Sequence, residues 1–455
     1  MKKILNFKGK RISSVGFFGL GKSSLALLSF LSERYTGLSF TLRTDTKKAP
    51  SDMFTKVYSG AAATDSITED LLFLSPSVRR DRPELQRCSE NGVILSSDVE
   101  FFFENKRVPA LAVTGSDGKS TTVTLASLML SRGKDDFPPS ANIGLPAVSL
   151  LQREIRGTVC ELSSFQLMNF TPKTERALIT NVSENHLDWH TSFNEYVRAK
   201  ENVLTHSEKR IFNLDCPYNS ALSEKYPAYA VFSRELTHEK MRQRVAANHY
   251  FSVENGYVCS SGMPLFPLKE IKLKGEHNLS NFLGAMALSY EIATTEKIIE
   301  VAQCFTGLAH RASLVGCYKG ISFYDSSIDS TPTRTLATLS TLKAPTVLIL
   351  GGRGKGLSYS PLSPLPKNVK AIILTGENRG EILKSLAKSP ENFHRGRRML
   401  STPDFAEAVT LAIKEAKEGD AVLLSPASTS FDSFSDYKER GNAFSDIIKK
   451  HYAEG

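Results

Sequence analysis

The sequence predicts an α/β protein of three domains, of which the first and the third are Rossmann-like. Short apolar runs alternate with helix-like segments along most of the chain. This alternation is interrupted by polar segments and restarts after each of them. The length of 455 residues also exceeds the roughly 250–300 residues that a single hydrophobic core normally serves. We place the domains at residues 1–107, 108–309 and 310–455.

The N-terminal domain begins with a predicted strand at 12–18 and a helix at 23–31. Further apolar runs at 38–42, 71–74 and 93–95 predict the other strands of a small parallel sheet. Ligands of such sheets bind at the carboxyl ends of the strands. The candidate ligand contacts at these ends are Gly19, Ser23, Arg43 and Ser75.

Residues 110–124 are the most informative stretch of the chain. An apolar run at 110–113 predicts a buried strand, a turn-forming cluster follows at 114–118, and a helix begins near Lys119. A strand, a glycine loop, a lysine followed by a hydroxyl residue and a helix together form a phosphate-binding loop, so we predict a P-loop ATPase domain with a mainly parallel sheet. Lys119 would neutralise phosphate charge, and the Ser120 hydroxyl would ligate Mg²⁺. The predicted ATP contacts are Gly115, Ser116, Asp117, Gly118, Lys119, Ser120 and Thr121.

A second stretch, residues 16–23, matches the complete phosphate-loop pattern, whereas the loop before Lys119 has Val113 in place of the first glycine. As a phosphate loop, that stretch would hold Phe17 and Phe18 against the nucleotide. These large apolar side chains fit better at the end of a buried strand. We therefore interpret residues 16–24 as a dinucleotide-fold turn and residues 113–121 as the ATP loop.

Two more strands of the central domain end in polar side chains. The strand at 158–162 ends at Glu161, where a P-loop domain is expected to supply a second Mg²⁺ ligand. The strand at 177–181 leads to His186 and His190, whose spacing resembles half of a zinc site, although no third ligand is evident.

Two helices of the central domain carry candidate residues. Ser192 is expected to cap a helix that contains Lys200. A later helix has Asn278 and Asn281 near its start. Both asparagines are suited to hydrogen bonding a base or a phosphate, and simple helix capping is the alternative.

In the C-terminal domain two strands end in loops suited to ligands. The strand at 346–350 is followed by a cationic glycine loop at 351–356, and the strand at 421–424 by a hydroxyl-rich turn at 425–430. Because both strands belong to one predicted sheet, we expect a site for a carboxylate at its ligand edge. The remaining predicted elements are strands at 321–324 and 371–374 and helices at 333–342, 381–386 and 405–417.

The composition of the chain bears on its expected binding partners and on its expected location in the cell. The net charge of +9 is scattered along the chain, and phosphorylated small molecules, nucleic acid or a merely solvated surface would each explain it. We expect no nucleic-acid partner. The sequence contains neither an apolar run long enough to span a bilayer nor a segment shaped like a signal peptide, so we expect a cytoplasmic protein without membrane insertion. The six cysteines show no CxxC spacing and are expected to be reduced and buried.

These segments, in this order, resemble the Mur ligases of peptidoglycan synthesis, and the resemblance covers nearly the whole chain. The segments E-L-S-S-F-Q and S-P-A-S-T-S-F-D resemble those of the members that add D-glutamate. The matching segments are F-G-L-G (18–21), S-P-S-V (75–78), T-G-S-D-G-K-S-T (114–121), N-I-G-L-P-A (142–147), E-L-S-S-F-Q-L (161–167), N-V-S-E-N-H-L-D (181–188), Y-V-R-A-K (196–200), H-N-L-S-N (277–281), G-L-A-H-R (307–311), G-G-R-G-K (351–355) and L-L-S-P-A-S-T-S-F-D (423–432).

The resemblance implies an ATP-dependent ligase that forms an amide bond through an acyl phosphate. Its three domains would bind a UDP-sugar, ATP and an amino acid, in that order along the chain. The implied substrates are UDP-N-acetylmuramoyl-L-alanine and D-glutamate, with two Mg²⁺ ions as cofactors. We expect the enzyme to act as a monomer in cytoplasmic synthesis of peptidoglycan precursors.

The resemblance also assigns roles to individual residues. Lys119, His186 and Lys200 would be catalytic. Ser120 and Glu161 would hold one Mg²⁺, and His186 and Lys200 would serve the other. Because an ammonium group cannot ligate a metal, Lys200 would have to be carbamylated. The remaining implied contacts are Asn278, Asn281 and Arg311 with ATP, Asn142 with the UDP-sugar, and Lys355, Ser430 and Tyr437 with glutamate.

Two departures from the family pattern keep alternatives open. Asp117 stands where asparagine is commoner, and the acidic residue of the segment 325–331 is shifted or lost, which leaves the ribose and glutamate contacts of that segment undecided. One alternative is a sister Mur or folylpolyglutamate-type ligase with another substrate. Another is a catalytically degenerate relative that binds ATP without turnover.

Overall fold

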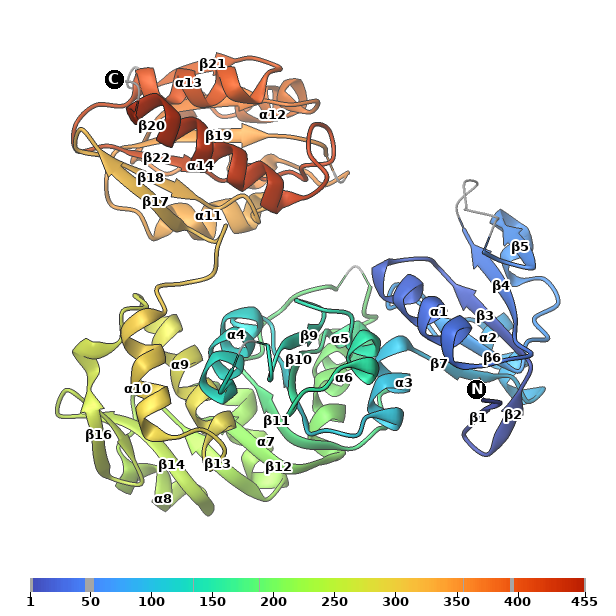
Figure 1. The fold of residues 1–455 in the computed structure, drawn as a ribbon. Coiled ribbons are helices and arrows are strands. Elements are labelled where there is room, and N and C mark those ends of the chain that lie inside the picture. The colour runs from blue at the N-terminus through green and yellow to red at the C-terminus, as the bar shows by residue number, and fades with distance from the viewer. Residues whose placement is uncertain are drawn as a thin grey trace. The chain divides into compact units, whose positions relative to one another are not determined.

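The structure is a computed structural model and describes residues 3–45, 53–133, 135–187, 189–354, 356–392 and 397–453 (Figure 1). The chain forms two compact units, residues 1–306 and 307–455. The first unit contains two separate parallel or mainly parallel sheets, and the second contains one. The α/β architecture predicted from the sequence is confirmed, while the domain boundaries at 107 and 309 remain predictions.

The N-terminal part has a parallel five-stranded sheet in the order β5-β4-β3-β6-β7. The strand predicted at 12–18 is in fact divided, because Ile12 ends the antiparallel hairpin β1–β2 and the sheet strand begins at Ser14. The elements are β1 (Leu5–Phe7), β2 (Lys10–Ile12), β3 (Ser14–Phe18), α1 (Lys22–Arg34), β4 (Ser39–Thr44), β5 (Lys56–Ser59), η1 (Gly60–Thr64), β6 (Leu71–Leu74), α2 (Pro83–Glu90), β7 (Ile94–Ser96) and α3 (Asp98–Asn105).

Helix α3 connects this sheet to the central domain through its phenylalanines. The Phe101 ring lies 5.3 Å from Phe7 and 5.7 Å from Phe73, between ring centroids. The Phe103 ring lies 5.2 Å from Phe170 of the central domain. Successive helical residues are about 100° apart around the axis, so Phe101 and Phe103, two residues apart, point to nearly opposite sides of the helix. One hydrophobic core therefore runs through both parts of the first unit.

The central sheet has nine strands in the order β16-β15-β14-β13-β12-β11-β8-β10-β9, of which only the hairpin strands β15 and β16 run antiparallel to their neighbours. Alternate residues of β8 enter two different cores, as expected for a sheet covered on both faces. The elements are β8 (Ala110–Thr114), α4 (Lys119–Leu130), β9 (Pro139–Ala141), η2 (Ala147–Gln152), β10 (Thr158–Glu161), α5 (Ser164–Leu167), β11 (Thr174–Ile179), α6 (Phe193–Thr205), β12 (Ser207–Asn213), α7 (Pro217–Lys225), β13 (Ala228–Phe232), α8 (His238–Arg244), β14 (Ala247–Glu254), β15 (Tyr257–Ser260), β16 (Met263–Pro267), η3 (Leu268–Glu270), α9 (Glu276–Ser289) and α10 (Thr295–Cys304).

The second unit has a six-stranded sheet in the order β17-β18-β22-β19-β20-β21, in which β17 alone is antiparallel. Separate apolar clusters cover its two faces. The elements are β17 (Ser313–Tyr318), β18 (Ile321–Asp325), α11 (Pro332–Ser340), β19 (Thr346–Gly351), η4 (Ser360–Leu362), β20 (Val369–Thr375), α12 (Arg379–Leu386), η5 (Pro390–Asn392), β21 (Arg398–Ser401), α13 (Phe405–Glu415), β22 (Ala421–Leu424) and α14 (Tyr437–Ala453).

Two details correct or extend the sequence analysis. All six cysteines are free thiols, but Cys304 and Cys317 are exposed, so the expectation that all six are buried was wrong for these two. The 17-residue helix α14 was not predicted. In the part of the chain that the structure describes, no helix has the length and apolar character needed to cross a membrane.

Candidate functional site

Four neighbouring parallel strands end together at one edge of the central sheet. Their order is β9-β10-β8-β11, and their register pairs Ala141 with Glu161, Glu161 with Val113, and Ile179 with Thr114. The polar segments that follow these strands are those singled out in the sequence. The parallel sheet therefore brings residues from four distant parts of the chain to one edge, where ligands of such sheets bind.

The loop between β8 and α4 has the backbone of a phosphate-binding loop. Gly118 has φ 77° and is the N-cap residue of α4, and the described residues provide no side-chain cap for this helix end. The first backbone N–H groups of α4 are thus available to an anion, and the helix dipole favours negative charge there.

Close packing explains the two glycines of this loop. A Cβ atom at Gly115 would lie 1.9 Å from the Thr180 hydroxyl oxygen, and one at Gly118 would lie 2.1 Å from the Asn281 side-chain oxygen. Asn281 was predicted to contact ATP, and the structure places it directly against the loop. Thr180 was not predicted, although it lies at the end of β11 beside the segment that was.

The hydroxyl group of Ser116 connects the loop to its surroundings. Its Oγ atom donates to the Ser183 carbonyl (2.9 Å) and lies 2.8 Å from the Tyr196 hydroxyl of α6. Burial raises the pKa of Tyr196 to about 12. The backbone N–H of Asp117 donates to Asn181 Oδ1 (2.9 Å), so the departure at position 117 leaves the backbone of the loop anchored.

Two lysine amines meet at the phosphate loop. Lys119 Nζ donates to the carbonyls of Gly115 (2.8 Å) and Ser116 (2.9 Å). Lys200 Nζ, from α6, donates to the same Gly115 carbonyl at 2.8 Å. Lys200 is 2% exposed. Its burial, and after that the nearby charge of Lys119, lower the pKa of Lys200 to about 6, so this amine is largely neutral at pH 7.

Glu161 has the surroundings of a metal ligand. Its side chain is 2% exposed, and Asn142 Nδ2 donates to its Oε1 at 2.7 Å. Its Oε2 is buried and has no hydrogen-bond partner among the described residues. A buried carboxylate oxygen without a donor is costly unless a cation occupies its free side, and oxygen ligands suit Mg²⁺. The residues present therefore fit a magnesium ion.

The predicted UDP-sugar contact Asn142 is thus turned toward Glu161. Its amide orients the carboxylate, in the way that hydrogen bonds commonly hold metal ligands in place. Among the described residues, no three His, Cys, Asp or Glu side chains form a ready metal cage. For an ion at Glu161, the predicted ligand Ser120, phosphate oxygens and water would have to supply the other ligands.

Of the two histidines after β11, His186 is exposed and His190 is buried. His190 Nε2 lies 2.9 Å from the Ser164 hydroxyl, and its burial lowers its pKa. The His186 ring lies 4.9 Å from the Phe165 ring. The two imidazoles are therefore used differently, and only His186 is accessible to a ligand.

Backbone strain is found in the loops of this site. Ala141, which ends β9, has φ 71°, and His186 has φ 55°. The left-handed region is unfavourable for residues with a Cβ atom, and such residues are often found at functional sites. In the second unit, Ala427 of the hydroxyl-rich turn has φ 53°.

The N-terminal sheet brings three of its predicted contacts to one edge. Residues 16–18 lie inside β3 with both phenylalanines buried, which confirms the strand predicted there. That residues 16–24 are not the ATP loop stays a prediction. A Cβ atom at Gly19 would lie 2.8 Å from that of Ser75. Ser23, in the first turn of α1, interacts with the carboxylate of Asp98, whose pKa is raised by burial.

Arg43, the fourth predicted contact, is instead saturated by the protein. Its guanidinium is 1% exposed and donates from Nε and Nη2 to Glu69 (2.9 and 3.1 Å). The other N–H groups donate to the carbonyls of Ala63, Asp65 and Ser66. All five donors are used, so Arg43 supports the domain and offers no free donor to a ligand.

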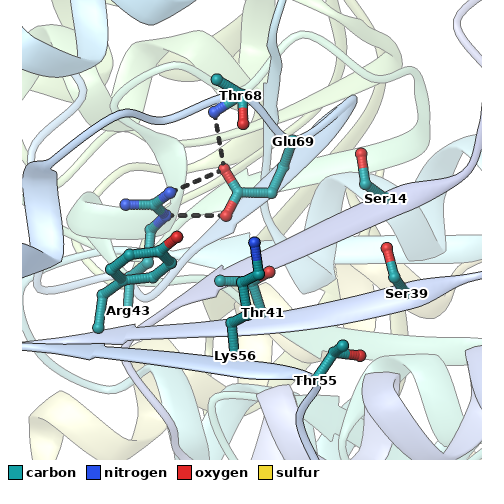
Figure 2. Close-up of a pocket in the computed structure, with 9 residues that line it drawn as sticks. Ser14, Ser39, Thr41, Arg43, Thr55, Lys56, Thr68 and Glu69 are labelled. Carbon is teal, nitrogen blue, oxygen red and sulfur yellow. Dashed lines mark hydrogen bonds and ion pairs between the residues drawn. The ribbon is translucent and has the colours of Figure 1, made fainter.

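Figure 2 shows the cavity beside this ion pair. It encloses about 150 Å³ and is lined by hydroxyl groups, among them Ser14, Ser39 and Thr41, and by Lys56. Ser14 Oγ already donates to Asp70 (3.1 Å). The cavity is polar, and the hydrogen-bonded side chains of Arg43 and Glu69 line one side of it.

In the second unit, the glycine loop and the hydroxyl-rich turn lie side by side. β19 and β22 are neighbours, and beyond their ends Arg353 and Thr429 exchange backbone hydrogen bonds of 3.0 Å in both directions. Asn378 accepts from Gly352 N (2.9 Å) and donates to the Ser428 hydroxyl (2.8 Å). The structure thus joins the two loops that the sequence predicted to share one site.

The predicted glutamate contacts are only partly described. Ser430 is buried, and the Tyr437 ring, at the start of α14, lies 6.0 Å from the ring of His310. Lys355 lies outside the described residues. The predicted ATP contact Arg311 follows His310, which has φ 61°.

Arg440 was not predicted as a site residue. It connects the hydroxyl-rich turn at 425–430 to the segment 325–331, which differs from the family pattern. It is buried and donates to the Ser327 hydroxyl (2.9 Å) and to the carbonyls of Ser428 (3.0 Å) and Thr429 (2.9 Å). Burial lowers its pKa to about 10. The carboxylate of Asp325, at the start of that segment, pairs with His310 (2.6 Å), a residue of the same unit.

Comparison with known proteins places this arrangement in a family. The Mur ligase middle domain matches residues 113–289, and the Mur ligase glutamate ligase domain matches residues 310–428. The UDP-N-acetylmuramoylalanine–D-glutamate ligase of Acetivibrio thermocellus is 34% identical over 98% of this chain and 98% of its own. The chain belongs to the Mur ligase family. The enzyme of the same name from Clostridium novyi is 35% identical over 83% of this chain and 82% of its own.

Solved structures support the Mur ligase fold. UDP-N-acetylmuramate-alanine ligase from Thermotoga maritima superposes with a TM-score of 0.56 at 18% identity, covering 97% of this chain and all of that one. A pseudomurein peptide ligase type C from Methanothermus fervidus gives the same TM-score at 16% identity, with 96% of this chain and all of that one covered. At these identities the likeness concerns the three-domain α/β fold alone.

Proposed function

We propose that this Mur ligase couples ATP cleavage to the addition of D-glutamate to UDP-N-acetylmuramoyl-L-alanine, as a cytoplasmic monomer. The observation that carries the proposal is the grouping, at one sheet edge, of the phosphate loop, the buried amine of Lys200 and a Glu161 oxygen that has no hydrogen-bond partner among the described residues. Relatives that are 34–35% identical to this chain are named UDP-N-acetylmuramoylalanine–D-glutamate ligases, which supports this choice of substrates.

The chemistry requires a leaving group on the alanyl carboxylate. A carboxylate oxygen attacks the γ-phosphorus of ATP, the bond to ADP breaks, and an acyl phosphate forms. The amine of D-glutamate attacks the acyl carbon, loses a proton, and inorganic phosphate departs as the amide forms. The phosphate loop and Lys119 balance the charge between the two anions during the first step.

Ser120 and Glu161 would hold one magnesium ion, and His186 with Lys200 would hold the other. The bound ions would neutralise charge on the phosphoryl group during its transfer. Lys200 is suited to carbamylation because its lowered pKa leaves a nucleophilic amine that can add to CO₂. The resulting carbamate is an anion with oxygen ligands, in contrast to an ammonium group.

The joined loops of the second unit are proposed to hold D-glutamate. Ser430 and Tyr437 would contact its carboxylates, together with Lys355. Asn278, Asn281 and Arg311 are proposed ATP contacts, and Gly19, Ser23, Ser75 and Asn142 are proposed contacts of the UDP-sugar. Asn281 has the strongest geometric support, because it packs against Gly118.

Phosphate release with UDP-N-acetylmuramoyl-L-alanine, ATP and D-glutamate tests the proposal. The matched pair of variants is Lys119→Ala and Lys22→Ala, since each lysine follows a glycine in a loop that resembles a phosphate site. We expect only Lys119→Ala to abolish turnover. Activity with another amino acid in place of D-glutamate would indicate a sister ligase, and ATP binding without turnover would indicate a degenerate relative. Either result would overturn the proposal.

A further inference from the structure

One contact between the N-terminal part and the central domain is unusually well formed. Arg79 follows the predicted UDP-sugar loop at Ser75, and its Nη1 and Nη2 atoms donate to the two carboxylate oxygens of Glu195 at 3.0 and 2.9 Å. Nη1 also donates to the carbonyl of Trp189 at 2.9 Å. A bidentate arginine–carboxylate pair fixes the relative orientation of its two groups as well as pairing their charges. Within the N-terminal part, Asp81 accepts from Nε of the same guanidinium and so orients it.

Trp189 completes this contact. Its Nε1 donates to the Ser77 carbonyl at 3.2 Å, and the Arg79 guanidinium lies over its ring, 5.0 Å from the centroid. The Trp189 ring also lies 4.6 Å from that of Phe165, between ring centroids, in the segment after Glu161. The two parts are thus joined by hydrogen bonds, an ion pair and a cation–π contact.

On the central side, the contact is attached to the site itself. Trp189 lies three residues after His186. Glu195 is in the first turn of α6, where its backbone N–H donates to Ser192 Oγ, and the same helix carries Lys200. Because a helix moves as a rigid element, a displacement of Glu195 would also displace Lys200.

We propose that Arg79 and Trp189 are positioning residues that hold the UDP-sugar loop against the segment of His186 and the helix of Lys200. Sugar-nucleotide binding and the second Mg²⁺ site then depend on each other. Neither residue touches the reacting atoms. The inference rests on the proposed function for the identity of the ligands, whereas the contact itself can be tested without turnover.

The first test uses intrinsic fluorescence, because Trp189 is the only tryptophan in the sequence. Arg79→Ala should shift the Trp189 emission to longer wavelength and increase its quenching by acrylamide. Arg82→Ala is the matched control, since Arg82 lies in the same segment but contacts Asp45 and Phe18 of its own domain. Unchanged emission in Arg79→Ala would show that the contact is absent in solution.

The second test separates positioning from simple structural support. Arg79→Ala should raise the KM for UDP-N-acetylmuramoyl-L-alanine and the Mg²⁺ concentration for half-maximal rate, each by about tenfold, because small misplacements of reactants are costly. Arg79→Lys keeps the charge without the two-pronged geometry and should restore only part of the loss. A changed emission with an unchanged KM and Mg²⁺ dependence would overturn the coupling.

A failure of the proposed function is distinguishable from a failure of this inference. If the wild-type protein releases no phosphate, binding of UDP-N-acetylmuramoyl-L-alanine can still be followed through Trp189 emission. Weaker binding by Arg79→Ala than by Arg82→Ala would support the positioning role. Equal binding by the two variants would overturn it.

Discussion

Arg43 in the N-terminal sheet and Lys200 in the central domain are both basic side chains with almost no exposure, 1% and 2%. Arg43 uses all five N–H groups on protein acceptors and faces Glu69. Lys200 has one short bond to a carbonyl and lies near a second lysine, and no carboxylate pairs with it at salt-bridge distance among the described residues. The protein thus supplies every partner that the Arg43 guanidinium needs. The Lys200 amine is left for a ligand or a modification to complete its interactions. A buried basic group whose donors are all used by the protein supports structure, and one whose donors are only partly used indicates a site.

The largest expected effect is on catalysis at the phosphate loop. Lys119→Ala should lower turnover by at least about 1,000-fold, equivalent to about 4 kcal/mol, because it removes charge opposite the transferring phosphoryl group. Steady-state phosphate release measures this. The thermal midpoint should stay close to that of the wild type, and a large loss of stability would show that Lys119 also supports the fold.

Arg43→Ala should have the opposite signature. It leaves Glu69 buried without its partner, which should reduce the free energy of unfolding by about 3–5 kcal/mol. Urea denaturation measures the loss, with Lys22→Ala as a surface control. The remaining folded enzyme should keep its KM for the UDP-sugar. A raised KM in folded Arg43→Ala would return this residue to the ligand site.

Glu161→Gln should separate the metal role from packing. The amide oxygen can still accept from Asn142, but the charge on the partnerless side is lost. We expect turnover to fall by about 100-fold and the required Mg²⁺ concentration to rise, since a neutral ligand binds the cation less strongly. Stability should be equal or higher, because the variant no longer buries a negative charge. A rate within about twofold of the wild type, the size of effect expected from a substitution at a neutral position, would argue against Glu161 as a metal ligand.

Lys200 should make the stability of the protein depend on pH. Its pKa is about 6 in the folded protein and about 10.4 in the unfolded chain. Between these values the unfolded state binds one more proton, so stability rises with pH by up to about 1.4 kcal/mol per pH unit. Below pH 6 both states are protonated and this dependence ends.

The comparison of wild type with Lys200→Met, in bicarbonate-free buffer from pH 6.5 to 8.5, isolates this contribution. The wild type should gain stability relative to the variant as the pH rises. Equal slopes for the two proteins would show that Lys200 stays protonated, and the contrast with Arg43 would then disappear.

Local chemistry made much of the fold predictable. Apolar runs identified the strands that carry ligands, and the glycines and lysine of 114–121 identified the phosphate loop. The interpretation of Phe17 and Phe18 as the end of a buried strand is confirmed, since both are buried in β3. The amphipathic helix α14 and the hairpin β1–β2 were missed, because short or strongly charged segments give weak periodic signals.

The sequence by itself predicted which residue types would meet phosphate, metal and carboxylate, because those chemistries depend on loops whose residues are adjacent in the chain. Only the tertiary structure decided that Asn142 orients Glu161, that Arg43 is saturated, and that Arg79 reaches Glu195 across 116 positions. Such pairings depend on strand order and sheet register, which bring together segments that carry no local record of one another.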